Sequence, residues 1–334
     1  MQAEAPTIPP RGIKEFRKGV DVFRVFCWLA AAATVVTLIW ILFEITHQAW
    51  PAMKLFGFGF LTDSQWIPSR DQYGVLPFLV GTAVSSVLAI LIALPLGLAI
   101  AIFLSEDFLP LPVRQVVRFT VEMLAAIPSV VYGLWGIVVV IPLVKAFGTW
   151  AVTMFTPQPI GVTGDYTAGV PFLKLIFAAP AYGNSMLTAS VVLALMILPT
   201  ITAISRTALV AVPGTLREGS YALGATRWEA IFGVILPTAA PGVVAATILA
   251  LGRAMGETMA VAMLIGNSSR LTWSLLSPAG TLAGLLANQF AEADGLQVSS
   301  LMFAALLLVG LTLIVNMVGE AVLRYTQRKT AGIR

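Results

Sequence analysis

Six apolar segments, each long enough to cross a bilayer, constrain this chain more than any other feature of its sequence. A helix needs about 20 apolar residues to span the hydrocarbon core. Of the 334 residues, 58% are hydrophobic and only 11% are charged, which is not the composition of a soluble domain. We therefore predict an all-α integral membrane protein with six spans, at 25–48, 76–104, 121–145, 186–207, 240–265 and 298–321.

The distribution of basic residues predicts the orientation of these spans. Most of the 20 Lys and Arg residues lie before the first span, in the second and fourth connections, or after the last span. Cytoplasmic connections carry such an excess, so we expect both termini in the cytoplasm, with tails over 1–24 and 324–334 and a transmembrane domain over 25–323. Basic residues beside helices also contact anionic lipid headgroups. The net charge of +4 therefore calls for no nucleic-acid partner.

The sequence has neither a cysteine cluster for a metal nor a phosphate-binding loop for a nucleotide. Cys27 and His47 are the only cysteine and histidine, which excludes an intrachain disulfide and a cysteine-based metal cluster. No phosphate-binding loop of the Gly-x-x-x-x-Gly-Lys type occurs. We expect this chain to be no enzyme and to bind no cofactor or metal, so any ATP chemistry must come from a partner.

The fourth connection predicts a compact helical loop over 213–237. Pro213 stands where it can begin a helix, and Gly224 stands where it can end one. Thr226, followed three residues later by Glu229, forms the pattern of a capping box for a second helix. The sequence therefore predicts two short helices that meet at Gly224 beside the membrane.

This loop resembles the EAA loop of binding-protein-dependent ABC importer permeases, whose pattern is Glu-Ala-Ala, Gly and Leu-Pro at fixed spacing. The residues that carry the resemblance are Glu218, Gly219, Ser220, Gly224, Leu236 and Pro237. Gly219 and Ser220 replace the two alanines. The resemblance implies a six-helix type I ABC importer permease fold in a bacterial plasma membrane, with 213–237 as the coupling loop to a cytoplasmic ATPase. An ordinary amphipathic hairpin at the membrane surface is the alternative.

Two charged residues, Arg253 and Glu257, lie within the fifth predicted span. An ionised side chain near the bilayer centre costs roughly 2.5 to 3.5 kcal/mol on insertion scales, so such residues are usually functional. In one continuous helix, residues four apart share a face. Gly252 and Gly256 would then form a seam of small residues on the adjacent face, where we expect contact with a second permease subunit.

The pair has two interpretations. In the structural one, Arg253 and Glu257 neutralise each other and hold the packing, although Arg before Glu is the weaker order at this spacing. In the functional one, Arg253 contacts a transported anion and Glu257 discriminates among oxyanions. Phosphate near neutral pH keeps an O–H that a carboxylate can accept, whereas sulfate has none.

The surrounding sequence resembles the Gly-Arg-Ala-x-Gly-Glu-Thr signature of phosphate importer permeases, of the PstC rather than the PstA type, and continues so to Asn267. In the functional interpretation, Arg253, Glu257 and Thr258 line the substrate path. The resemblance implies as partners a second, PstA-type permease, two PstB-type ATPase subunits that hold ATP and Mg, a PstS-type phosphate-binding protein, phosphate itself and membrane lipid.

Further candidates are weaker, and other functions stay open at this stage. Glu122 is either part of an inner gate or a carboxylate at the start of a helix, and we favour the second. Pro128 is expected to kink its helix and so to border a gate, although packing alone would explain it. Asn267, Asn288 and Gln289 either meet substrate or make loop hydrogen bonds.

The rival functions are an ABC permease for sulfate, molybdate or phosphonate, an ion-coupled secondary transporter, and a membrane scaffold.

Overall fold

The computed structural model describes residues 12–106, 108, 110–155, 183–272 and 274–331, and this part of the chain is almost entirely helical. Six of its helices are long and apolar enough to cross a membrane, which confirms the predicted fold class. Their bounds are Val22–Phe56, Leu76–Ser105, Ser129–Ala151, Met186–Val210, Arg227–Gly256 and Leu296–Arg328.

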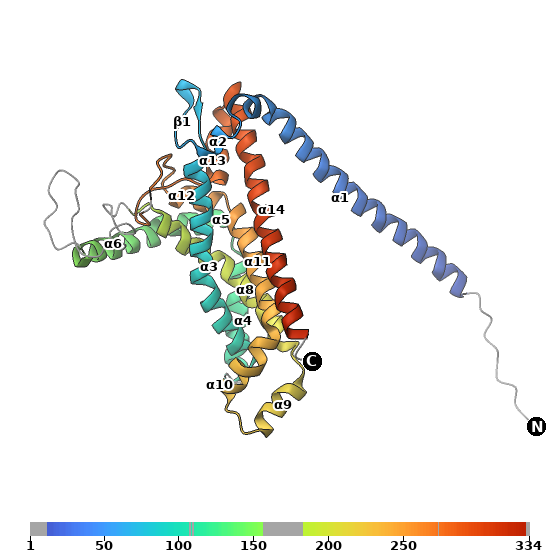
Figure 1. The fold of residues 1–334 in the computed structure, drawn as a ribbon. Helices are drawn as coiled ribbons and strands as arrows, with labels where there is room; N and C mark the ends of the chain where they lie inside the picture. The colour runs from blue at the N-terminus through green and yellow to red at the C-terminus, as the bar shows by residue number, and fades with distance from the viewer. Residues whose placement is uncertain (1–11, 107, 109, 156–182, 273, 332–334) are drawn as a thin grey trace, which may run out of the picture.

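Four long helices form the bundle: α3 (Leu76–Ser105), α8 (Met186–Val210), α11 (Leu236–Gly256) and α14 (Leu296–Ala331). Helix α8 packs against α3 and α11, and α14 covers the other side of α11 (Figure 1). The main core lies where small side chains let helices approach closely. It includes Ala89, Ala93, Leu193, Ile197, Ile201 and Ala250.

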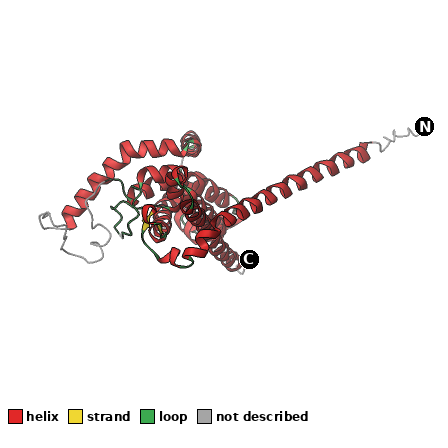
Figure 2. Ribbon diagram, turned by 90° about the horizontal axis from the view of Figure 1, so that it is seen from above, coloured by secondary structure: helices red, strands yellow, loops and turns green. Residues whose placement is uncertain are grey.

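Helix α1 (Gly12–Phe56) leaves the bundle and extends away from it (Figures 1 and 2). Only its last turns pack into the molecule, where Ala49 and Ala52 join a buried cluster with Leu301 of α14. The most apolar part of α1 has no buried residues within this chain. Because α1 begins at Gly12, the second half of the predicted tail over 1–24 is helical.

Short elements close the end of the bundle opposite the coupling loop. After α1 come α2 (Gly59–Thr62), strand β1 (Trp66–Ile67), the 3₁₀ turn η1 (Pro68–Arg70) and strand β2 (Gln72–Tyr73), which pairs with β1. Before α14 come α13 (Leu282–Gln289) and the 3₁₀ turn η4 (Phe290–Glu292). These elements surround the aromatic cluster of Phe60, Trp66, Tyr73 and Phe78.

The third predicted span, 121–145, is not one helix. Helix α4 (Leu111–Ala126) begins earlier, and the chain is extended at Ile127 and Pro128. It then resumes as α5 (Ser129–Trp135), the π-helical η2 (Gly136–Val140) and α6 (Ile141–Phe155). Pro128 has no N–H and disfavours a helical residue before it, so the predicted kink is a complete break.

The fifth predicted span, 240–265, is wrong at both ends. The helix starts as α10 (Arg227–Ala230), passes through the π-helical η3 (Ile231–Ile235) and continues as α11 to Gly256. The helix thus continues past Pro237 instead of beginning after the coupling loop. The wider π turn ahead of Pro237 accommodates the residue's missing N–H and its ring. Beyond Gly256 a separate short helix, α12 (Met259–Leu264), follows.

Candidate functional site

The first part of the candidate site is the break between α4 and α5. Ile127 and Pro128 have ψ angles of 126° and 143°, so neither is helical. The Tyr132 hydroxyl donates to the Leu124 carbonyl at 2.8 Å, which links the two helices across the break. Non-helical backbone at membrane depth is tolerated only where protein buries it or where it lines a water-filled cavity.

The second part is the break between α11 and α12, which contains the charged pair. Arg253 lies in the last turn of α11, where a cation is favoured by the helix dipole. Glu257 is extended, with φ −70° and ψ 123°, so the helix stops before it. The expectation that Arg253 and Glu257 share one helix face is therefore wrong. No ion pair joins these two described side chains; Arg253 is exposed and Glu257 half-buried.

Local chemistry explains why α11 ends at this point. Gly256 is a poor helix residue and Thr258 is β-branched. The Thr258 hydroxyl donates to the Gly256 carbonyl at 3.2 Å and so satisfies one of the carbonyls that the helix end leaves free. Thr258 therefore stabilises the break itself.

The two breaks lie side by side because α5 packs on α12. A Cβ at Gly133 would lie 2.7 Å from the Met263 sulfur and 3.3 Å from the Ala260 Cα, so glycine permits this approach. The fold thus brings a guanidinium, a carboxylate and two interrupted helices together, an arrangement that can bind an anion within a membrane.

The two glycines of the seam differ in their surroundings within the described part of the chain. A Cβ at Gly252 would lie 3.5 Å from the Asn316 side chain of α14, which is ordinary contact, and a Cβ at Gly256 would meet nothing within 4 Å. Close packing of Gly256 against a second subunit stays a prediction.

The structure corrects the preferred interpretation of Glu122. The residue lies well inside α4 and not at a helix start, and its carboxylate pairs with Arg118 at 2.7 Å. Both side chains are more than half exposed, so this pair contributes little to stability. A gate that involves Glu122 and Pro128 stays a prediction.

The coupling loop has the local structure that its sequence predicts. Helix α9 (Gly214–Ala222) follows Pro213, and Gly224 has a left-handed φ of 86°. Thr226 and Glu229 form the capping box at the start of α10. The second helix is not short, however, because α10 continues into the membrane helix.

The residues that carry the resemblance to the EAA loop differ in their exposure to solvent. Glu218, Gly219, Gly224 and Pro237 are exposed, Leu236 is half-buried, and Ser220 is buried with its hydroxyl donating to the Arg217 carbonyl at 2.7 Å. The loop projects from the bundle (Figure 1) and bears exposed apolar side chains. Such a surface fits a protein partner. These side chains are Leu216, Tyr221, Leu223, Trp228 and Phe232.

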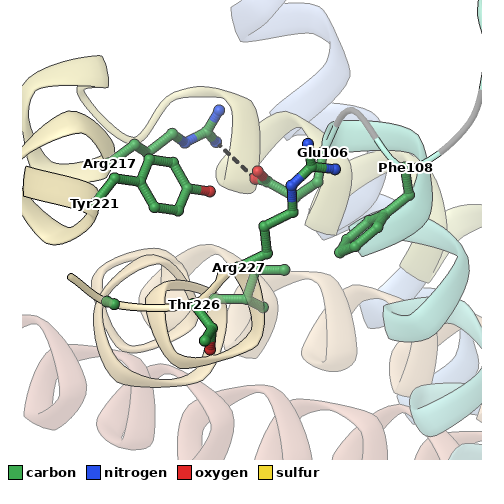
Figure 3. Close-up of a pocket in the computed structure, with 8 residues that line it drawn as sticks. Glu106, Phe108, Arg217, Tyr221, Thr226 and Arg227 are labelled. Atoms are coloured by element: carbon green, nitrogen blue, oxygen red, sulfur yellow. Dashed lines mark ion pairs between the residues drawn. The ribbon is translucent and has the colours of Figure 1, made fainter.

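Sequence reasoning missed a contact that joins this loop to the bundle. Arg217 of α9 lies 3.2 Å from the carboxylate of Glu106, which follows α3 (Figure 3). A cavity of about 550 Å³ lies beside this ion pair. Arg217 adjoins Glu218 in the sequence, but no local pattern identifies its distant partner.

The three polar candidates at the opposite end belong to one small cavity of about 140 Å³, which Asn267, Asn288 and Gln289 help to line. The Asn267 amide donates to the Ala262 carbonyl at 2.9 Å, a hydrogen bond between the loop and α12. Gln289 accepts from the Trp66 indole at 2.8 Å.

Among the described residues, no three His, Cys, Asp or Glu side chains gather as a metal site requires.

Known proteins agree with this architecture. A family model described as "Binding-protein-dependent transport system inner membrane component" matches residues 93–332. The phosphate transport system permease protein PstC of Mesorhizobium japonicum is 38% identical over 95% of this chain and 94% of its own length. The protein of the same name from Pasteurella multocida is 38% identical over 94% and 92%.

Two solved structures share the fold at low identity. A bacterial ABC transporter involved in the import of the acidic polysaccharide alginate matches 92% of this chain and 99% of its own, with a TM-score of 0.55 and 17% identity. An inward-facing MetNI methionine ABC transporter matches 76% and 94%, with a TM-score of 0.50 and 22% identity. The chain therefore belongs to the family of binding-protein-dependent transport system inner membrane components, and within it to the group of PstC permeases.

Proposed function

We propose that this chain is the membrane-spanning permease subunit of an ATP-driven importer of inorganic phosphate. The observation that carries the proposal is the placement of Arg253 and Glu257 at a helix break that packs against a second helix break. The names of the PstC relatives support phosphate as the cargo. No feature of the site favours sulfate, molybdate, phosphonate or an ion-coupled mechanism over it.

The chemistry of the pair suits phosphate. Because no ion pair joins Arg253 to Glu257, the guanidinium is available to a passing oxyanion. Glu257, as a carboxylate, accepts the remaining O–H of phosphate and repels sulfate. Thr258, whose hydroxyl already donates to the Gly256 carbonyl, keeps Glu257 outside the helix.

The energy comes from partners of this chain. A cytoplasmic ATPase with bound ATP and Mg docks on 213–237, which places both termini in the cytoplasm. A second permease of similar fold completes the path, and a phosphate-binding protein delivers the cargo from the other side. Closure of the ATPase moves the coupling loop, which opens the region of Arg253 toward the binding protein, and hydrolysis resets it.

Uptake by the assembled complex in proteoliposomes tests the proposal. We expect Arg253→Ala to abolish phosphate uptake. We expect Glu257→Gln to cut the preference for phosphate over sulfate by about 10-fold or more, because the amide keeps an acceptor for the phosphate O–H but loses the charge that repels sulfate and gains an N–H donor that sulfate can use. Arg324→Ala is the matched control, because Arg324 is 71% exposed and, among the described residues, forms its ion pair with Glu320 of the same helix. Wild-type uptake and selectivity in both site variants would refute the assignment.

A further inference from the structure

Helix α9 has little direct packing against the bundle. It packs on α10 and η3, and it has no comparable contact with α3 or α8 among the described elements. The cavity of about 550 Å³ separates it from the segment that follows α3 (Figure 3). Its lining includes Glu106, Phe108, Arg217, Tyr221, Thr226 and Arg227.

Arg217 spans this gap with two contacts. Its Nη2 donates to the Leu209 carbonyl in the last turn of α8 at 2.7 Å and lies 3.2 Å from Glu106 Oε1. Glu106 is itself anchored, because its N–H donates to Ile102 of α3 and its carbonyl accepts from Arg114 of α4. One side chain of α9 therefore contacts the ends of α3 and α8.

The burial of this ion pair distinguishes it from the others. The side chains of Arg217 and Glu106 are 23% and 12% exposed, whereas those of the Arg324–Glu320 pair are 71% and 60% exposed. Exposed pairs contribute little, but removal of one partner of a mostly buried pair leaves an uncompensated charge. Replacement of Arg217 or Glu106 therefore leaves a mostly buried charge without its partner, whereas replacement of Glu320 leaves an exposed one.

Helix α10 does not depend on this ion pair. Trp228 stacks on Phe108 with ring centroids 5.1 Å apart, and Ile231 of η3 is buried with Leu209 and Ala101. The α10 side of the coupling loop thus contacts Phe108, in the segment that follows α3, and its continuation η3 packs with residues of α3 and α8. The α9 side, which carries Glu218, has Arg217 as its described polar link to both helices.

We infer that Arg217 and Glu106 are positioning residues that bind α9 rigidly to the ends of α3 and α8, so that a displacement of α9 moves the bundle. This inference rests on the proposed function of 213–237 as the coupling loop. Neither residue touches the cargo or ATP. Their role is to set how many phosphate ions move for each ATP that is hydrolysed.

The test measures phosphate uptake and ATP hydrolysis together in proteoliposomes that contain the full complex. In Glu106→Gln and Arg217→Gln, we expect phosphate imported per ATP to fall about 5-fold or more, the usual size of a lost coupling between sites, while ATP hydrolysis continues. The charge exchange Glu106→Arg with Arg217→Glu should recover part of the ratio. Glu320→Gln, at the exposed pair of α14, should keep the wild-type ratio.

A covalent link gives a second, independent measurement. The only native cysteine, Cys27, is exposed, so Cys27→Ser provides a background for Glu106→Cys with Arg217→Cys. A short bis-thiol reagent that joins the new cysteines should restore the ratio, because the inferred contact stays closed throughout the cycle.

The outcomes separate this inference from the proposed function. A wild-type ratio in either single variant, or a transporter that the link blocks, would overturn the positioning role. Failure of the wild-type complex and of Glu320→Gln to import phosphate would instead contradict the proposed function.

Discussion

Replacement of Gly97 by alanine should separate α3 from α8, because these helices touch at that glycine. A Cβ at Gly97 would lie 2.9 Å from Cγ2 and 3.2 Å from Cβ of Ile201, and 3.3 Å from the Thr202 hydroxyl. Carbon atoms in contact prefer about 3.5 to 4.0 Å. Ile201 is fully buried and β-branched, so it cannot rotate away.

The expected cost follows from these distances. An overlap of this size in a packed core costs about 1 to 3 kcal/mol. Alanine is the better helix former by roughly 1 kcal/mol, which offsets part of that cost. Gly310→Ala in α14 has the same propensity gain and no atom within 4 Å of the new Cβ. The difference between the two variants therefore isolates the packing cost.

Thermal unfolding of the purified chain in detergent measures this difference. At about 2 °C for each kcal/mol in a large chain, Gly97→Ala should melt roughly 2 to 6 °C below Gly310→Ala. The hydrogen bond from the Thr202 hydroxyl to the Gly97 carbonyl, 3.3 Å long, would weaken as well. Equal midpoints for the two variants would show that α3 and α8 do not meet as described.

Three further outcomes are expected. Trp66→Phe should lower the free energy of unfolding, because the indole donates to Gln289 at 2.8 Å and the smaller ring packs less well in the buried aromatic cluster; in a Gln289→Leu background the loss should be about 1 kcal/mol smaller, the hydrogen-bond part. Burial raises the pKa of the Tyr73 hydroxyl, and so do the charge of Asp71 and a hydrogen bond to Asp71. The protonated hydroxyl therefore stabilises the fold fully below about pH 10, the pKa in the unfolded chain. This stabilisation is lost as pH rises through the folded pKa. Asp71→Asn should lower the pKa of Tyr73, and an ultraviolet titration that finds the same Tyr73 pKa in this variant would contradict the assignment. Gly256→Leu should not lower the melting midpoint of the isolated chain, since a Cβ there meets nothing within 4 Å and leucine is the better helix former, but it should reduce co-purification with a second permease.

The coupling loop was predictable because its signals are local. The capping box needs only Thr226 and Glu229, three residues apart, and a left-handed residue at the end of α9 needs only Gly224. The same local reasoning failed for the helix that follows. The predicted span begins at 240, after Pro237, but the π turn before Pro237 lets the helix continue from the coupling loop to Gly256.

The charged pair of the candidate site stands out in the sequence, but its geometry does not. Arg253 and Glu257 were identified because charges are costly inside an apolar span. The expected shared face required a continuous helix, and α11 ends between them. The approach of Gly133 to Ala260 depends on how α5 packs on α12, for which the sequence has no periodic signal.

The sequence by itself determined the membrane class, the six apolar helices and the residues of the charged pair, because hydropathy and capping act over neighbouring residues. Only the tertiary structure decided that two helix breaks adjoin and that Arg217 reaches Glu106 across a cavity. Contacts of this second kind join residues far apart in the chain. They depend on which helices pack together and at what depth, and in a bundle of uniformly apolar helices local composition does not determine either.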